Sequence, residues 1–270
     1  AVHAEGVLTR RDRPVHWNPD VVPTAPRLDY YNVREWDGPE RVAVAHGPLV
    51  AVVERAGPLG FRGRHGEPPV PEVEVSVGYR FLAGQPHFLQ SATIVARRDV
   101  ELHAMRLGGE LAFAGNAFTR AFWPGPDGAV VGVRLDDPRA DDRVHGFRGG
   151  RVPWSTPWLA FHRPETGDGI AVVFLETYAL DPRAADLRAP RHADGILVHG
   201  SVGDDYWFRA PIWEFALYHP DRTPAVLVPA GAIYGEVNAI LPFNASREDA
   251  PAALAAADRR LRHPLRAELE

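Results

Sequence analysis

Apolar and polar residues alternate with a period of two over much of the chain from Arg41 onward. The clearest case is "EVEVSVGYRF", residues 72–81, in which Val and aromatic residues occupy one set of alternate positions and Glu, Ser and Arg occupy the other. This period is typical of a strand with one face on a core. We therefore predict a strand here whose polar side faces water.

Further apolar runs, separated by Gly and Pro, predict more strands of the same kind. They are "RVAVAH", "LVAVVERAG", "FLQSATIVAR", "DVELHAMRL", "ELAFAG", "AFTRAFW", "GAVVGVRL", "GILVHGSV", "PAVLVPAG" and "AIYGEVNAILPF". Turns are predicted at residues 47–48, 83–86 and 165–169, because Gly, Pro, Asp and Thr gather there. The last of these turns predicts a hairpin within "PWLAFHRPETGDGIAVVFLETYAL".

Four segments interrupt the strand pattern. Residues 1–40 contain many aromatic residues and prolines without a clear period, so we expect a long ordered arm with one strand, lying against a sheet. Residues 135–157 and 181–195 are expected to be loops. Residues 246–262 predict a helix, because Ser246 and Asp249 resemble a capping box and strong helix formers follow. Together the elements predict an all-β fold, a large antiparallel sandwich with a short C-terminal helix, formed by residues 1–270 as a single domain.

Composition limits the classes of partner. A formal net charge of -5 in a chain of 270 residues gives no excess of basic residues for nucleic acid. No apolar run is long enough for a membrane helix, so no membrane partner is expected. The chain has no Cys and no Lys, which excludes disulfides, thiolate chemistry and Schiff bases and leaves base catalysis to His, Tyr, Asp or Glu. Because the chain begins with Ala, we expect a processed or excised chain, with a lean toward a secreted bacterial protein.

A resemblance to a known superfamily rests on three stretches. The strand pattern of "GYRFLAGQPHFLQSATIVARRDVELHAMRL", together with "GPLVAVVERAGPLG" and "VPAGAIYGEVNAILPF", resembles the galactose mutarotase-like supersandwich over residues 40–245. That fold occurs in aldose epimerases, polysaccharide lyases and domains of glycoside hydrolases, so the resemblance implies a carbohydrate ligand. The catalytic histidines and carboxylate of aldose epimerases find no residue-by-residue match here, and no role is carried over.

The strand "AIYGEVNAILPF" carries the first set of candidate site residues. Tyr234, Glu236 and Asn238 share one of its faces. Three hydrogen-bonding side chains in a row would suit the floor of a sugar site, because sugar hydroxyls need donors and acceptors. The alternative is an ordinary solvent-facing strand side.

The stretch "DDYWFRAPIWEFALYHP" carries the second set, in which aromatic rings could stack on sugars and Arg could bind a uronate. Its candidates are Trp207, Arg209, Trp213, Glu214, Tyr218 and His219. A bulge at Pro211 would shift the alternation, which leaves open whether Trp207 or Trp213 faces outward. The alternative is that these aromatic residues belong to the core.

Single candidates elsewhere complete the set. His162 and Glu176 lie in the predicted hairpin and Trp158 begins it, whereas Trp17 and Asn18 of the arm could close over a sheet. His87 follows Pro86 at a strand start, where a loop could reach a cleft, although an isolated His is more often structural. No metal-binding, nucleophile-elbow or nucleotide-binding motif is present, so neither a metal nor a cofactor is expected.

The function predicted from these residues is cleavage of an acidic saccharide by β-elimination. Arg209 and Asn238 would neutralise the uronate, His162 or His219 would act as the base, and Tyr234 or Tyr218 as the acid. The alternatives are a glycoside hydrolase with a pair among Glu176, Glu214 and Glu236, a sugar epimerase, or a non-catalytic carbohydrate-binding module. An oligo- or polysaccharide is the expected partner, with a homo-oligomer as a further expectation, since flat sheets associate through exposed strands.

Overall fold

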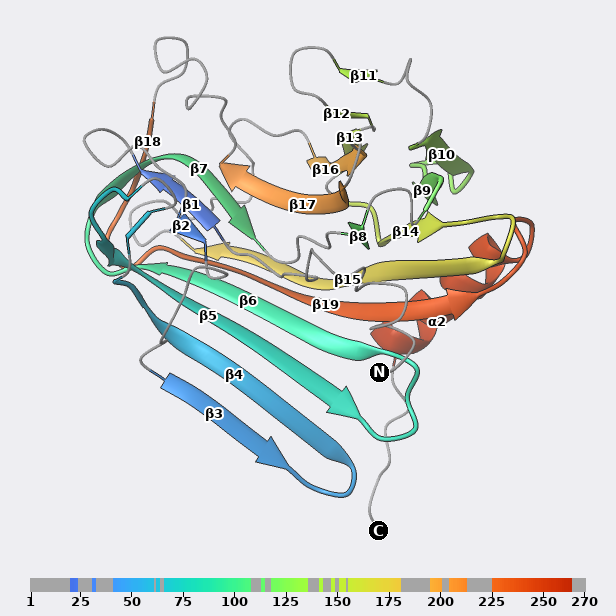
Figure 1. The fold of residues 1–270 in the computed structure, drawn as a ribbon, viewed down its shortest axis with the longest axis horizontal. Coiled ribbons are helices and arrows are strands. Elements are labelled where there is room, and N and C mark those ends of the chain that lie inside the picture. Colours follow the sequence, from blue (N-terminus) through green and yellow to red (C-terminus); the bar gives the residue numbers. More distant parts are fainter. Residues whose placement is uncertain are drawn as a thin grey trace.

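A computed structural model describes most of the predicted strands. The described residues are 20–23, 31–32, 41–60, 62–63, 66–107, 113–114, 118–135, 141–142, 147–148, 151–153, 155–180, 195–200, 204–212 and 225–263. In this part of the chain the strands form two large sheets and a two-stranded ribbon, and all of their pairings are antiparallel. Figure 1 shows the long strands of the larger sheet running side by side below the shorter strands of the other sheet.

The larger sheet has nine strands in the order β10-β9-β14-β15-β19-β6-β5-β4-β3. In chain order they are β3 (Arg41–His46), β4 (Val50–Leu59), β5 (Val70–Leu82), β6 (Phe88–Ala96), β9 (Arg120–Pro124), β10 (Val130–Arg134), β14 (Trp158–His162), β15 (Asp168–Leu180) and β19 (Ile233–Asn244). β19 is the last described strand along the chain, but it lies between β15 and β6, in the middle of the sheet (Figure 1). The sheet thus joins the N-terminal and C-terminal halves of the chain.

The smaller sheet has eight strands and contains the order β13-β16-β17-β7-β1-β2, with β18 beside β7 and β8 beside β17. Its members are β1 (Asp20–Pro23), β2 (Tyr31–Asn32), β7 (Val100–Leu107), β8 (Phe113–Ala114), β13 (Arg151–Pro153), β16 (Gly195–Gly200), β17 (Asp204–Ile212) and β18 (Val226–Val228). The ribbon pairs β11 (Asp141–Asp142) with β12 (Phe147–Arg148).

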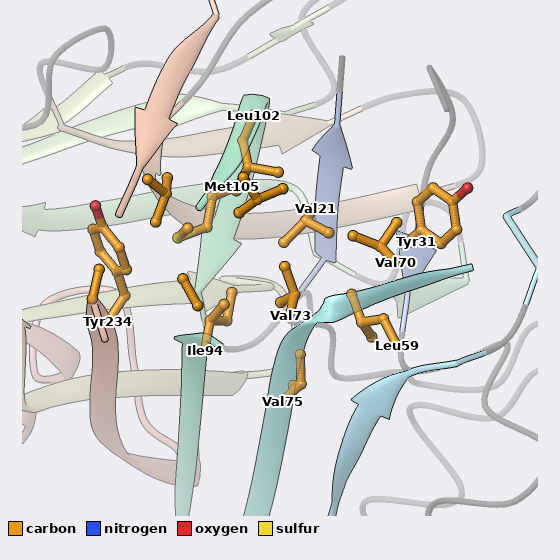
Figure 2. Close-up of a cluster of buried hydrophobic side chains, with 14 of the residues drawn as sticks. Val21, Tyr31, Leu59, Val70, Val73, Val75, Ile94, Leu102, Met105 and Tyr234 are labelled. Atoms are coloured by element: carbon orange, nitrogen blue, oxygen red, sulfur yellow. The ribbon is translucent and has the colours of Figure 1, made fainter. Parts of the chain in front are cut away.

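The core lies between the two large sheets. The alternate valines of β5 are buried and pack with Val21 of β1 and with Leu102 and Met105 of β7. Figure 2 shows these side chains in one cluster, with Tyr234 of β19 and Ile94 of β6. We call this side of the nine-stranded sheet the inner face and the opposite side the outer face. The large antiparallel sandwich predicted from the sequence is confirmed.

The helix α2 (Ala250–Arg262) covers part of the outer face. Its Leu254 and Ala257 pack with Ala239 and Leu241 of β19. The backbone N–H of Asp249 donates to Ser246 Oγ at 3.0 Å, so the predicted capping residues do interact at the start of the helix. The C-terminal helix is confirmed, with its first turn at Ala250 rather than Ser246.

Turns follow the predicted positions, whereas the arm and one loop differ from expectation. Gly84 and Gly167 adopt positive φ angles of 72° and 79° in the turns between β5 and β6 and between β14 and β15. The described part of the N-terminal arm holds two strands, β1 and β2, which belong to the smaller sheet instead of lying against it. Residues 135–157, expected to be a loop, contain the short strands β11, β12 and β13. The predicted loop 181–195 lies outside the described residues apart from Gly195.

Candidate functional site

The predicted polar row of β19 lies on the inner face. Tyr234 belongs to the core between the sheets, and Ile240 belongs to a second buried cluster on the same face. Glu236 and Asn238 lie between them and are 0% exposed. The alternation was therefore predicted correctly, but the face that carries these residues is neither open to solvent nor a floor that a sugar could reach directly.

A buried hydrogen-bond network holds this row together. The amide nitrogen of Asn238 donates to Glu236 Oε1 at 2.6 Å and to Gln90 Oε1, on the neighbouring strand β6, at 3.0 Å. Gln90 is also 0% exposed. Within the described residues, Gln90 Nε2 and Asn238 Oδ1 are buried without a hydrogen-bond partner. The network rigidifies the centre of the sheet, because buried polar groups that bond one another fix the register of their strands.

His162 and Trp158 face the opposite side of the sheet. Trp158 packs in the cluster beneath α2 and meets the Phe122 ring edge-on at 5.7 Å. His162 is 0% exposed, its ring stacks on Phe243 at 5.6 Å, and its Nε2 lies 3.1 Å from the carbonyl oxygen of Ala245. This is the environment of a structural histidine, so neither residue enters the site that we propose.

Two of the three predicted carboxylates, Glu176 and Glu236, lie on opposite faces of the sheet. A register shift between Phe174 and Glu176 places Glu176 opposite Val237, whereas Thr177 stands opposite Glu236. Residues directly opposite in a sheet share a face, so Glu176 is on the outer face and Glu236 on the inner face. The two carboxylates cannot act on one glycosidic bond.

The remaining predicted residues are described only in part or not at all. Trp207 and Arg209 lie on β17, whose pairing with β7 shifts register between Arg209 and Ile212, as expected from a bulge at Pro211. Their side chains fall outside the described structure. Residues outside it altogether are Trp17, Asn18, Trp213, Glu214, Tyr218 and His219.

A hollow on the outer face lies over Gly78 of β5. In the register, Glu54 of β4, Gly78 and Ser91 of β6 stand side by side, followed by Val237 of β19. Gly78 has no side chain, and the Ser91 hydroxyl lies over it, 2.6 Å from where a Cβ would be, while a gap remains around this row. The gap has a volume of about 140 Å³ and is lined by Val52, Glu54, Gly78, Tyr79, Arg80, Leu89, Ser91 and Val237. A cavity of about 150 Å³ accepts one six-membered ring.

The lining of the hollow combines an apolar floor with polar side chains that form no hydrogen bond or ion pair within the described residues; we call these side chains uncommitted. Apolar side chains come from three strands, and a carboxylate, a guanidinium and a hydroxyl come from Glu54, Arg80 and Ser91. Glu54 and Arg80 are exposed. None of these three side chains forms a hydrogen bond or ion pair within the described part of the chain. They are therefore available to a ligand, unlike Glu74 two rows away, which pairs with Arg41 and Arg97.

His87 directly precedes Phe88, the first residue of β6, and is not among the residues that line the hollow. Partial burial lowers the pKa of His87 below its ordinary value of 6.5, and the positive charge of Arg260 lowers it further. His87 is thus mostly neutral at neutral pH. In the unfolded chain His87 keeps its ordinary pKa of 6.5 and therefore binds more protons than in the folded protein between that pH and its lowered folded-state pKa. The free energy of unfolding therefore decreases as the pH falls from 6.5 through the folded-state pKa.

We expect Arg260→Gln to raise the pKa of His87, because the substitution removes a nearby like charge. The pKa is measured by NMR titration of the imidazole C–H resonances. Arg98→Gln serves as the control, since Arg98 is an exposed Arg beyond the other end of β6. An unchanged pKa in Arg260→Gln would mean that the two side chains are not neighbours in solution.

The residues of the hollow were not singled out from the sequence, although one signal pointed to them. Gly78 interrupts the polar positions of "EVEVSVGYRF", where Ser76 and Arg80 flank it. A Gly inside a strand often marks close approach of a ligand or another backbone. Its partners across the sheet, Glu54 and Ser91, follow only from the strand order and register.

Metal and membrane sites have no support among the described residues. No group of three or more His, Asp or Glu side chains is placed there to hold a metal ion. No helix in the described part of the chain is long and apolar enough to span a membrane.

No protein-family model matches the sequence, and no curated protein matches it. Solved structures with a similar fold include the α-N-acetylgalactosaminidase NagBb of Bifidobacterium bifidum, with a TM-score of 0.49, 13% identity and coverage of 96% of this chain and 36% of that protein. The α-galactosidase of Lactobacillus brevis gives a TM-score of 0.45 and 11% identity over 92% of this chain and 29% of the enzyme. A proposed aldose 1-epimerase of Escherichia coli K12 gives 0.39 and 10% identity over 84% of this chain and 82% of that one.

All three TM-scores lie below 0.5, and these likenesses concern the path of the chain alone. This chain spans about a third of the length of the two glycosidases. Their activities are therefore no guide to the chemistry of the hollow, which rests on its own residues.

Proposed function

We propose that this chain is a carbohydrate-active protein that binds one sugar residue of its ligand in the Gly78 hollow. The observation that carries the proposal is the pairing of an apolar floor with three uncommitted polar side chains around a gap the size of a six-membered ring. The polar row of β19, which the sequence suggested as a sugar-binding floor, is buried and does not contact solvent.

A pyranose ring matches this lining on both of its surfaces. Its C–H face is apolar and would rest on Val52, Leu89 and Val237, whereas its hydroxyls would meet polar groups at the rim. Carboxylate oxygens only accept hydrogen bonds, a guanidinium only donates them, and a hydroxyl does both. Glu54, Arg80 and Ser91 therefore offer the complete set that sugar hydroxyls need.

The same lining favours an acidic saccharide and β-elimination as the reaction. The guanidinium of Arg80 can pair with a uronate in bidentate fashion. Hydrolysis by the usual mechanism needs two carboxylates roughly 5 to 9.5 Å apart, and the lining supplies only that of Glu54. Glu176 is on the same face but belongs to β15, beyond Val237.

In the proposed step, Arg80 neutralises the uronate and Glu54 takes the proton from C5. A double bond forms between C4 and C5 as the C4–O bond breaks, and the leaving oxygen takes a proton. We propose Tyr178 as the donor: it does not line the hollow, but its hydroxyl lies 3.2 Å from that of Thr93, the next outer-face residue after Ser91 on β6. Both proton transfers then involve side chains of one face.

The test is a panel of neutral and uronic polysaccharides, read by ultraviolet absorbance, by reducing ends and by binding. We expect a uronic member to bind and to give an absorbing unsaturated product. Glu54→Gln should leave binding within about threefold and remove most of the absorbance, whereas Arg80→Gln should weaken binding about 10-fold through loss of a charge-assisted hydrogen bond.

The other outcomes separate the alternatives. Binding without either product would identify a non-catalytic carbohydrate-binding module. Reducing ends without absorbance would replace elimination by hydrolysis. If no saccharide binds, or if Arg80→Gln binds as well as the unmodified protein, the hollow is not the site.

A further inference from the structure

The strand β3 forms an open edge of the nine-stranded sheet. Among the described strands it pairs only with β4, and Figure 1 shows it at the border of the larger sheet. All six of its residues are exposed, with Val42 at 59% and Val44 at 67%. Proteins usually protect such an edge with lysine, proline or a bulge, because its unpaired backbone groups can bind another strand. β3 contains neither residue, and its pairing with β4 has no shift of register.

The unpaired backbone groups of β3 belong to alternate residues. The N–H of Gly47 donates to the carbonyl oxygen of Val50 at 2.8 Å, so this pair is hydrogen-bonded in the hairpin of β3 and β4. Bonded and non-bonded pairs alternate along an antiparallel ladder. The residues whose N–H and C=O groups point away from β4 are therefore Val42, Val44 and His46.

The side chains of the same three residues extend the apolar inner face to the edge of the sheet. Val44 stands opposite Val53 of β4, which stands opposite Tyr79 of β5, in the row that reaches the buried Gln90. Exposure in this row rises from 0% at Gln90 to 67% at Val44. Phe81, in the next row, is 45% exposed. The inner face therefore leaves an apolar border around β3 that the rest of the chain does not cover.

The edge carries no charge that would repel an identical edge. Arg41 is the only Arg, Lys, Asp or Glu of β3, and its guanidinium pairs with Glu74 of the same sheet at 2.7 Å. From Val42 to Ala45 the strand holds only Val and Ala. Charges at an interface select partners of opposite sign, so a neutral apolar strand matches another neutral apolar strand. β3 has this composition itself, and a second copy of the chain fits the edge.

We propose that two copies of this chain associate through β3, with the two strands antiparallel and centred on Val44. A two-fold axis perpendicular to the sheet keeps the inner faces on one side, and directly opposite residues then share a face. Val44 stands opposite the partner's Val44, and Val42 opposite the partner's His46. Each opposite pair exchanges two hydrogen bonds, so every unpaired group from Val42 to His46 finds a partner. Centring on Ala43 would leave the groups of His46 beyond the described strand.

The arrangement places both hollows on the outer face of one continuous sheet. Ala43 and Ala45 are the outer-face residues of β3 next to Glu54 and Val52, which line the hollow. In the pair of copies these alanines form a flat strip between the two hollows. Five strand spacings separate β5 of one copy from β5 of the other, which is about 24 Å. A long ligand could contact both copies, although the association itself does not depend on the saccharide and is measured without it.

The interface is small, so the association should be weak. One short strand per copy buries less than the roughly 800 Å² per partner of a standard stable interface. We expect a dissociation constant of about 10 to 100 μM. Sedimentation velocity over protein concentrations from about 1 to about 500 μM measures it.

Val44→Lys should raise the dissociation constant at least about tenfold, because it sets two positive charges opposite each other on the two-fold axis. The exposed position and the N–H that points away from β4 leave the fold of each copy unchanged, which circular dichroism checks. Val130→Lys is the matched control. Val130 is an exposed valine of β10, the opposite edge of the same sheet, so its substitution should change the constant by no more than about twofold.

Single cysteines report the register directly, because the chain has no Cys of its own. Val44→Cys should give a disulfide-linked dimer under mild oxidation. The Cα atoms of an opposite, hydrogen-bonded pair lie about 5.5 Å apart, within the range that a disulfide spans. Val130→Cys should form the linked dimer at least about tenfold more slowly at the same concentration.

Three results would overturn the proposal. The unmodified protein could remain monomeric at about 500 μM, well above the expected dissociation constant. Val44→Lys and Val130→Lys could weaken association equally, which would indicate general electrostatics or larger assemblies that pair β3 with β10 of the next copy. Ala43→Cys could cross-link faster than Val44→Cys, which would refute the register centred on Val44.

Discussion

Replacing Gly78 with Val should abolish saccharide binding while leaving the sheet intact. A Cβ at this position would lie 2.6 Å from Ser91 Oγ and 3.6 Å from the Glu54 side chain, so the new side chain would displace two of the polar groups that line the hollow. We expect affinity to fall by at least about 100-fold, which corresponds to roughly 2.7 kcal/mol. Calorimetric titration with the saccharide found in the panel measures the loss.

The fold should tolerate this substitution. Gly78 has no positive φ, so an L-residue can adopt its backbone conformation, and the Ser91 hydroxyl can rotate away. Val also suits a strand better than Gly, which offsets part of the crowding. We expect the free energy of unfolding to change by no more than about 1 kcal/mol.

Ser76→Val is the matched control for this prediction. Ser76 is the preceding outer-face residue of β5 and does not line the hollow. It gains the same β-branched side chain one row away, so affinity should stay within about twofold of the unmodified protein. If Gly78→Val binds as well as Ser76→Val, the saccharide site lies elsewhere.

Replacing Asn238 with Ala should cause the largest loss of stability, about 3 kcal/mol in the free energy of unfolding. The side chain of Asn238 donates to both Glu236 and Gln90, and all three residues are 0% exposed. Its removal leaves a buried carboxylate and a buried amide without this shared donor, and water cannot easily replace it. Urea unfolding monitored by tryptophan fluorescence measures the change.

Asn244→Ala provides the control on the same strand. Asn244 also donates two hydrogen bonds, to Asp168 at 2.9 Å and to the carbonyl oxygen of Thr166 at 3.2 Å, but it is exposed. Because water can replace its partners, we expect a loss below about 1 kcal/mol. Equal losses in the two variants would show that the inner network adds nothing beyond an ordinary surface hydrogen bond.

The two predictions together separate the inner and outer faces of the sheet. Asn238→Ala should lower the free energy of unfolding and, at temperatures where the protein stays folded, leave saccharide affinity unchanged. Gly78→Val should lower saccharide affinity and leave the free energy of unfolding nearly unchanged. This contrast arises because β5, β6 and β19 carry a stabilising network on one side and the candidate site on the other.

Local chemistry in the sequence was sufficient to predict the long strands of the larger sheet, their alternating faces and the C-terminal helix. The alternation in β5 identified Val73, Val75 and Val77 as core residues, and that of β19 placed Glu236 and Asn238 together. Gly84 and Gly167 marked two turns, and Ser246 marked the approach to the helix. Each of these features depends on residues only a few positions apart in the chain.

Tertiary structure alone decided what each face does. A period of two divides a strand into two sides but does not say which side a second sheet will cover, so the polar row of β19 could be taken for a sugar-binding floor. The same applies to His162, which contacts Phe243 and the carbonyl oxygen of Ala245, both far from it in the sequence. The hollow needs Glu54, Gly78 and Ser91 from three strands in one register, and only the pairing of those strands brings them together.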